Sequence, residues 1–175
     1  MKVLQALAVS IGLLAVLATW LFLGPLAAFK MQIWQAFIAW ACFFHCGGKT
    51  AGLVKTLSCM ILGAVVGMLS VMLAGQFGTL GALAAPVAVG IGAAVLVLAA
   101  NVPALSTIPA SVYGFGSVAG LILLKGLAPL EAVGPTIGSI VLGAAFGFAS
   151  EAFGGVLTKK EVRDEHLVAR ANPQS

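Results

Sequence analysis

The feature that most constrains this chain is a long stretch without charge. From Thr56 to Leu124 the sequence contains no Asp, Glu, Lys or Arg. Over all 175 residues, 8% are charged and 61% are hydrophobic, with a mean hydropathy of +1.14. A soluble domain carries roughly a quarter charged residues, and a single soluble core of this length could not bury so much apolar surface. The sequence therefore predicts a membrane protein whose helices are solvated by lipid.

The apolar runs are separated by Gly, Pro, Asn and Lys and are near the length of a membrane span. About 20 apolar residues are needed to cross about 30 Å of hydrocarbon. We therefore predict an all-α, multi-pass transmembrane helical bundle with about six spans, over residues 3–23, 33–46 (beginning near Ala27), 53–74, 80–100, 109–124 and 130–157. The first run is too long for the core of a secretory signal, so we expect a retained helix. The domain division is a transmembrane domain over 1–158 and a short charged C-terminal tail over 159–175.

The basic residues report orientation rather than a nucleic-acid surface. The net charge is +4, but the Lys and Arg residues are scattered between the spans and in the tail, so we expect no nucleic-acid partner. With six crossings, seven basic residues lie on the side of the N-terminus: Lys2, Lys49, Lys55, Lys159, Lys160, Arg163 and Arg170. Two lie on the other side, Lys30 and Lys125. A re-entrant fifth segment would change the count to four against five. The positive-inside rule thus favours six spans with both termini cytoplasmic.

The segment NVPALSTIPASVYGFG, residues 101–116, interrupts the apolar pattern with prolines and polar residues. Ser106 and Thr107 followed by Pro109 are typical of a helix start, and the helix that follows is short. A short, proline-started helix often lies at the solute site of a transporter, where its N-terminal N–H groups face a polar ligand. An ordinary tight cytoplasmic turn remains the alternative. The candidate solute path comprises Asn101, Ser106, Thr107, Pro109, Tyr113 and Glu151.

Glu151 is the one acidic residue well within a predicted span. An intramembrane carboxylate usually faces protein or water and can bind a cation or a proton. Because Leu157 is only about one and a half turns away, we favour a position near the cytoplasmic end, where Glu151 reaches the membrane interface or pairs with a lysine such as Lys49 or Lys55.

The segment CFFHC places Cys42, His45 and Cys46 on one helical face, with Cys59 on the next span. Zinc accepts these ligand types, but a closed site needs a fourth ligand. We therefore expect reduced, packed thiols, no bound metal and no cofactor. We also find no nucleophile–base pair, phosphate loop or paired carboxylates, and we expect no enzymatic activity.

Small residues recur at four-residue spacing in two predicted spans, at Gly63 and Gly67 and again at Ser139, Gly143 and Gly147. This spacing lets helix backbones approach closely in lipid. We favour packing within one bundle over a homo-oligomer interface.

Three segments carry a resemblance to a known family: WQAFIAWACFFHCGGKTAGLVKTL, LSTIPASVYGFGSVAG and LEAVGPTIGSIVLGAAFGF. Together they cover most of residues 34–155, and they resemble a bacterial family of inner-membrane proteins with a domain of unknown function, the family that includes YcdZ. The resemblance implies a multi-pass protein of the bacterial inner membrane and implies no activity.

Two functions follow from these observations. The favoured one is a channel or transporter for a small, uncharged or weakly polar solute. The alternative is a structural or regulatory membrane protein that acts through helix packing with partners and transports nothing.

Overall fold

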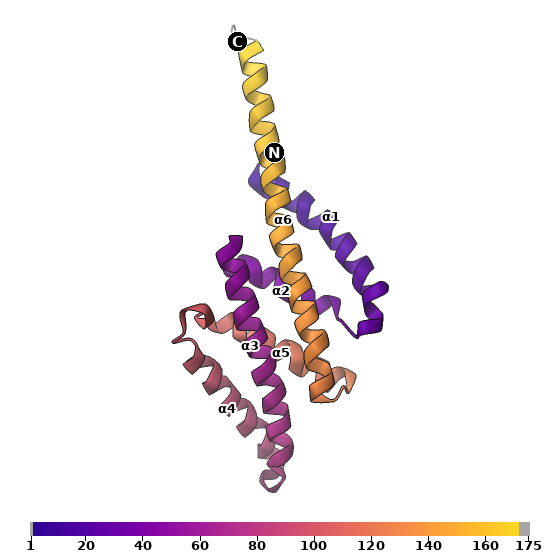
Figure 1. The fold of residues 1–175 in the computed structure, drawn as a ribbon, viewed down its shortest axis with the longest axis vertical. Coiled ribbons are helices and arrows are strands. Elements are labelled where there is room, and N and C mark those ends of the chain that lie inside the picture. Colours follow the sequence, from indigo (N-terminus) through magenta and orange to yellow (C-terminus); the bar gives the residue numbers. More distant parts are fainter. Residues whose placement is uncertain (1, 172–175) are drawn as a thin grey trace.

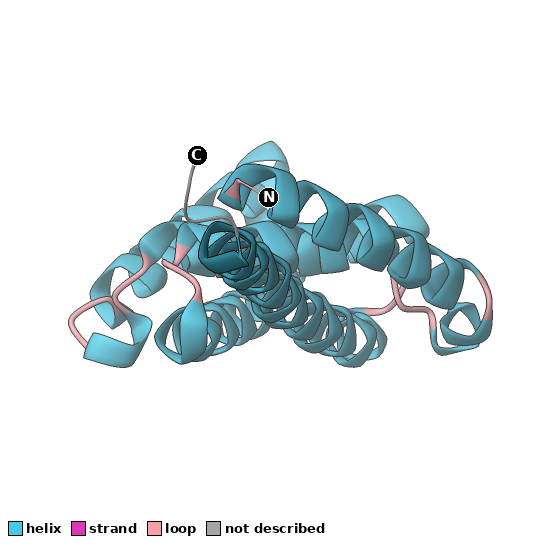
Figure 2. Ribbon diagram, turned by 90° about the horizontal axis from the view of Figure 1, so that it is seen from above, coloured by secondary structure: helices cyan, strands magenta, loops and turns pink. Residues whose placement is uncertain are grey.

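The computed structural model describes residues 2–171, with side chains described as far as Thr158. Over these residues the chain is all-helical, with short connections and no strand (Figure 1, Figure 2). The six α-helices are α1 (Val3–Leu23), α2 (Ile33–His45), α3 (Lys49–Gln76), α4 (Ala84–Ala99), α5 (Ile108–Lys125) and α6 (Pro129–Ala171). Three short 3-10 helices connect them, η1 (Pro25–Phe29), η2 (Gly78–Leu83) and η3 (Pro103–Leu105). The predicted all-α fold with six helices is confirmed.

Five of the helical segments in the described residues are long and apolar enough to cross a membrane. The exception is α2, whose 13 residues extend only about 20 Å. The prediction that this segment begins near Ala27 was wrong, because Pro25–Phe29 forms a separate 3-10 helix and Lys30 then adopts a left-handed conformation. The fifth helix, expected to be short, has 18 residues. The shortest helix is therefore α2.

The predicted tail falls at the edge of what the structure describes. The backbone of α6 continues as a helix through Ala171, past the predicted boundary at residue 158. The four basic residues of the tail fall within 159–175, whose side chains the structure does not describe.

The bundle consists of two halves with the same arrangement. The long helices α3 and α6 contact each other at the centre (Figure 1). The halves are α1–α3 and α4–α6. The last helix of each half packs against the first two helices of the other: α6 contacts α1 and α2, and α3 contacts α4 and α5. Each helix of the first half thus has an equivalent in the second half, α1 with α4, α2 with α5 and α3 with α6, and equivalent helices make the same contacts.

The sequences of α3 and α6 contain the same pattern. Residues 56–70 and 136–150 both read T-x5-L-G-A-x2-G-x2-S, so that Thr56 corresponds to Thr136 at a spacing of 80 residues. Ser139 and Cys59, which are equivalent in this pattern, each bond to the backbone of the segment that precedes the neighbouring helix. The backbone N–H of Gln32 donates to Ser139 Oγ at 3.0 Å, and the thiol of Cys59, the equivalent of Ser139, donates to the carbonyl oxygen of Ala104 at 3.6 Å. The two halves are thus an internal repeat in both sequence and structure.

Glycines at equivalent positions allow the closest helix contacts. A Cβ atom at Gly63 would overlap the carbonyl oxygen of Ser111 in α5, and one at Gly143 would overlap the carbonyl oxygen of Ala36 in α2. These small residues serve packing within one chain, as the sequence predicted. Self-association through other small-residue faces stays a prediction.

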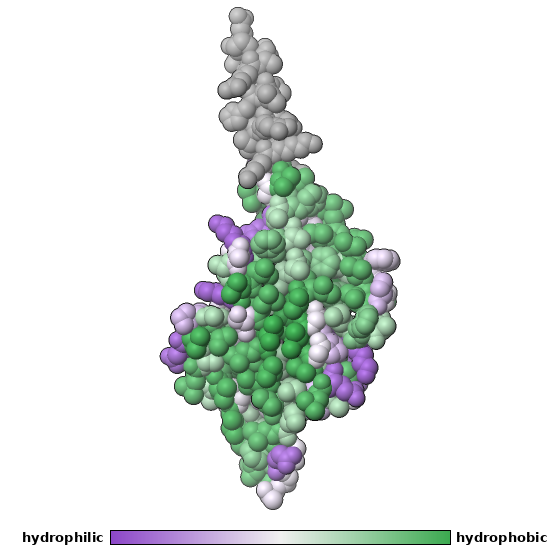
Figure 3. All heavy atoms as spheres, viewed as in Figure 1, coloured by the Kyte–Doolittle hydropathy of each residue, from purple (hydrophilic) through white to green (hydrophobic). Residues whose placement is uncertain are grey.

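The outer surface is largely apolar. Large hydrophobic side chains are strongly exposed on several helices, including Leu4, Trp20, Leu98 and Leu124. In the face shown in Figure 3, hydrophobic residues cover most of the area and hydrophilic residues gather in small patches near its edges. Such a surface suits a lipid environment rather than water.

Candidate functional site

The largest fully buried polar side chain among the described residues links the two halves of the bundle. Gln35, in the first half of α2, is fully buried. Its Nε2 donates to the carbonyl oxygen of Ser117 in α5 at 2.9 Å and to Thr136 Oγ1 in α6 at 3.0 Å. Sequence reasoning did not select Gln35, although a glutamine inside an apolar run is itself a signal of a buried hydrogen-bonding role.

Several buried polar atoms on the helices of this contact have no hydrogen-bond partner. Among the described side chains, Gln35 Oε1, Ser117 Oγ, Thr56 Oγ1 and Ser111 Oγ are inaccessible to solvent and have no hydrogen-bond partner. Burying such a group without a hydrogen bond costs about 1–3 kcal/mol, and in hydrocarbon no bulk water compensates. Four such atoms on α2, α3 and α5 mark the region where the halves meet as a candidate functional site.

The predicted solute path begins at the surface. Asn101, Ser106 and Pro109 are exposed, and Thr107 is partly buried. Asn101 Nδ2 donates to the carbonyl oxygen of Leu98 at 2.8 Å, which closes the end of α4 as predicted. Pro109 lies in the first turn of α5, also as predicted, but Thr107 makes no side-chain hydrogen bond to cap that helix within the described residues. The N–H groups at the start of α5 are thus not capped by the Thr107 side chain.

Tyr113 joins this segment to α2. Its hydroxyl lies 3.1 Å from Nδ1 of His45, the last residue of α2. The contact connects the first turns of α5 with the end of α2, so it spans the two halves of the bundle.

Glu151, a residue of α6, lies beside the first residue of α3. Its Oε2 accepts a hydrogen bond from the backbone N–H of Lys49 at 2.7 Å. The carboxylate also lies close to Gly48, where an added Cβ atom would come within 2.6 Å of Oε1. Sequence reasoning named Lys49 as a partner, but the group that Glu151 binds is the backbone N–H. A carboxylate at this position stabilises the positive end of the α3 dipole.

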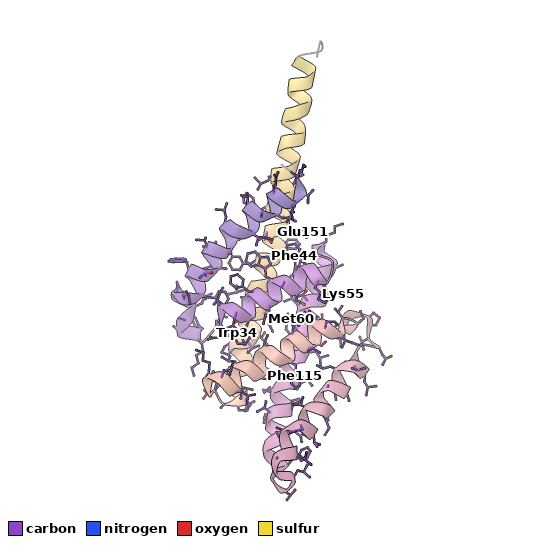
Figure 4. All side chains as sticks on the ribbon, turned by 180° about the vertical axis from the view of Figure 1, so that it is seen from behind. Trp34, Phe44, Lys55, Met60, Phe115 and Glu151 are labelled. Carbon is purple, nitrogen blue, oxygen red and sulfur yellow. The ribbon has the colours of Figure 1, made fainter. Side chains whose placement is uncertain are left out.

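Two pockets share the Glu151 carboxylate. One, of about 440 Å³, is lined by Val3 and Leu7 of α1, Phe44 of α2 and residues of α6. The other, of about 410 Å³, is lined by Lys49 and Thr50 of α3 and residues of α6. In Figure 4, Glu151 and Phe44 lie close together at one end of α2, and Trp34 marks the other end. Neither of these two pockets is lined by residues from the start of α5.

The three cysteines lie in the bundle core or against it, with Cys46 partly buried. Cys42 and Cys59 are fully buried, and Cys42 Sγ lies 3.9 Å from Cys46 Sγ. His45 instead turns toward Tyr113. In the part of the chain that the structure describes, no three His, Cys, Asp or Glu side chains converge as a metal site would require.

Taken together, the helical bundle, its apolar surface and its internal repeat define the class: a multi-pass helical membrane protein. Within that class, the chain belongs to the family described as protein of unknown function (DUF1097), whose model matches residues 8–155. The match includes most of α1 as well as the three segments on which the resemblance rested. No curated protein and no solved structure matches the chain.

Proposed function

We propose that the chain is a multi-pass protein of the bacterial inner membrane that passes a small, uncharged or weakly polar solute. The observation that carries the proposal is the repeat of two three-helix halves whose contact contains unpartnered buried polar atoms. In this proposal the short helix α2 also crosses the bilayer, so that α1–α3 and α4–α6 each cross three times and have opposite orientations. Inverted repeats of this kind are common in transporters, whose solute sites lie near the midplane between the repeats. The role needs no catalytic step and no cofactor.

The start of α5 supplies an entry region in this proposal. Ser106, Thr107 and Pro109 lie at the exposed or partly exposed beginning of that helix. Its N–H groups favour the acceptor atoms of a polar solute. Both termini are cytoplasmic in this proposal, as the distribution of Lys and Arg indicates.

The test is a liposome-swelling screen of purified protein with urea, acetamide and glycerol. We expect at least one solute to enter proteoliposomes faster than protein-free vesicles. The double variant Ser106→Ala plus Thr107→Val should slow that entry while the protein still folds. If no solute enters faster than in protein-free vesicles, the transport function fails and the structural or regulatory alternative is favoured.

A further inference from the structure

The orientation of the Gln35 amide follows from its partners. A backbone carbonyl oxygen can only accept a hydrogen bond, so the group that faces the carbonyl of Ser117 must be Nε2. The same nitrogen also donates to Thr136 Oγ1. Both amide hydrogens are therefore used, and Oε1 is left as a buried acceptor without a donor among the described residues.

The hydroxyl of Ser117 adds a second unsatisfied group to this region. Ser117 is 1% exposed, and within residues 2–158 its Oγ has no partner although its carbonyl oxygen binds Gln35. The region thus offers an acceptor at Oε1 and a hydroxyl that can both donate and accept. The side chains that make these contacts are uncharged. This chemistry fits a small neutral molecule that carries N–H or O–H donors and an acceptor oxygen.

The internal repeat shows that the arrangement is specific to one half. Gly63 and Gly143 are equivalent in the repeat, and they contact Ser111 and Ala36 respectively. Ser111 is therefore the equivalent of Ala36, and Ala110 is the equivalent of Gln35. Alanine has no hydrogen-bonding side chain, so Ala110 makes no bond to Thr56 like the one that Thr136, the equivalent of Thr56, accepts from Gln35. The hydrogen bonds of Gln35 therefore occur at only one of the two equivalent contacts among the described residues.

We propose that Gln35, Ser117 and Thr136 form the binding site for one small neutral solute at the contact between the two halves. This inference rests on the proposed transport function and locates its central site, beyond the entry region at the start of α5. In the structure the site is closed to solvent, so binding requires α2 and α5 to separate. Gln35 orients the solute through Oε1, and Ser117 supplies the second hydrogen bond.

Ser117→Ala is the sharpest test, because it removes an unpartnered hydroxyl. A purely structural role predicts equal or greater thermal stability and unchanged flux. A binding role predicts that stability is kept or raised while the swelling rate falls by roughly two- to tenfold, the value of one hydrogen bond. Ser70→Ala is the matched control, because Ser70 is also buried in a helix but its Oγ donates to the carbonyl oxygen of Val66 at 2.8 Å. We expect Ser70→Ala to leave the swelling rate unchanged.

A second measurement reports opening of the site without requiring flux. Ser117→Cys is placed in a chain whose three native cysteines are replaced by alanine, and a negatively charged methanethiosulfonate reagent is added to vesicles. We expect the thiol at position 117 to be labelled, urea, acetamide or glycerol to slow the labelling, and a thiol introduced by Ser70→Cys to stay unlabelled.

The outcomes separate the site from the function. Suppose that the wild type transports a solute, that Ser117→Ala transports it equally fast, and that position 117 is no more reactive than position 70. This result overturns the site, whereas the transport function stands. If the wild type transports none of the solutes but they slow labelling at position 117, the site is supported as a binding site and the transport function fails. Labelling that no solute slows indicates water only and overturns the site.

Discussion

Gly143→Ala is expected to destabilise the contact between α6 and α2. The added Cβ atom would overlap the carbonyl oxygen, the carbonyl carbon and the Cα atom of Ala36. Backbone atoms cannot rotate away as a side chain can, so α2 must move as a whole. Overpacking of this kind costs about 1–3 kcal/mol, and the better helix propensity of alanine offsets at most about 1 kcal/mol. We expect a net loss of up to about 2 kcal/mol.

Gly134→Ala is the matched control in the same helix. A Cβ atom at this position meets no described atom within 4 Å, so alanine should be neutral or stabilise by up to about 1 kcal/mol. The two variants should thus differ by as much as about 3 kcal/mol, or about a hundredfold in the unfolding equilibrium. Equilibrium unfolding in mixed micelles measures the difference. Trp40 provides a signal, because its Nε1 donates to Ser150 Oγ of α6 at 3.0 Å. Equal stability of the two variants would refute the close contact.

Three further predictions concern orientation, metal content and the α3 start. A reporter active only in the cytoplasm, fused to Ser175, should be active, and a silent but well-expressed fusion would contradict the six-span topology. Elemental analysis of the purified protein should find less than one zinc per chain; one zinc per chain that is lost on Cys42→Ser would overturn this expectation. Glu151→Ala should destabilise the protein by about 1 kcal/mol, because the backbone N–H of Lys49 loses its acceptor. Glu151→Gln should retain most of that stability in the same unfolding assay, and equal losses would argue against the capping role.

The sequence pointed to the segment at the start of α5, whereas the structure also points to the buried residue Gln35. The segment around Asn101 and Pro109 was recognisable because proline and polar residues have strong local preferences. Gln35 was overlooked because one polar residue in an apolar run shows no period or motif. A comparison of the chain with itself at a spacing of 80 residues would have revealed the repeat and drawn attention to Thr56 and Thr136.

By itself, the sequence determined the membrane class, the all-α fold and the bounds of α1, because hydropathy and helix-breaking residues act locally along the chain. Only the tertiary structure decided which helices touch. It showed that α2 is the short helix, that Glu151 binds a backbone N–H at the start of α3, and that Gln35 meets Ser117 and Thr136. These contacts join residues about 80 to 100 positions apart, and no local pattern encodes which of several similar apolar faces will pack together.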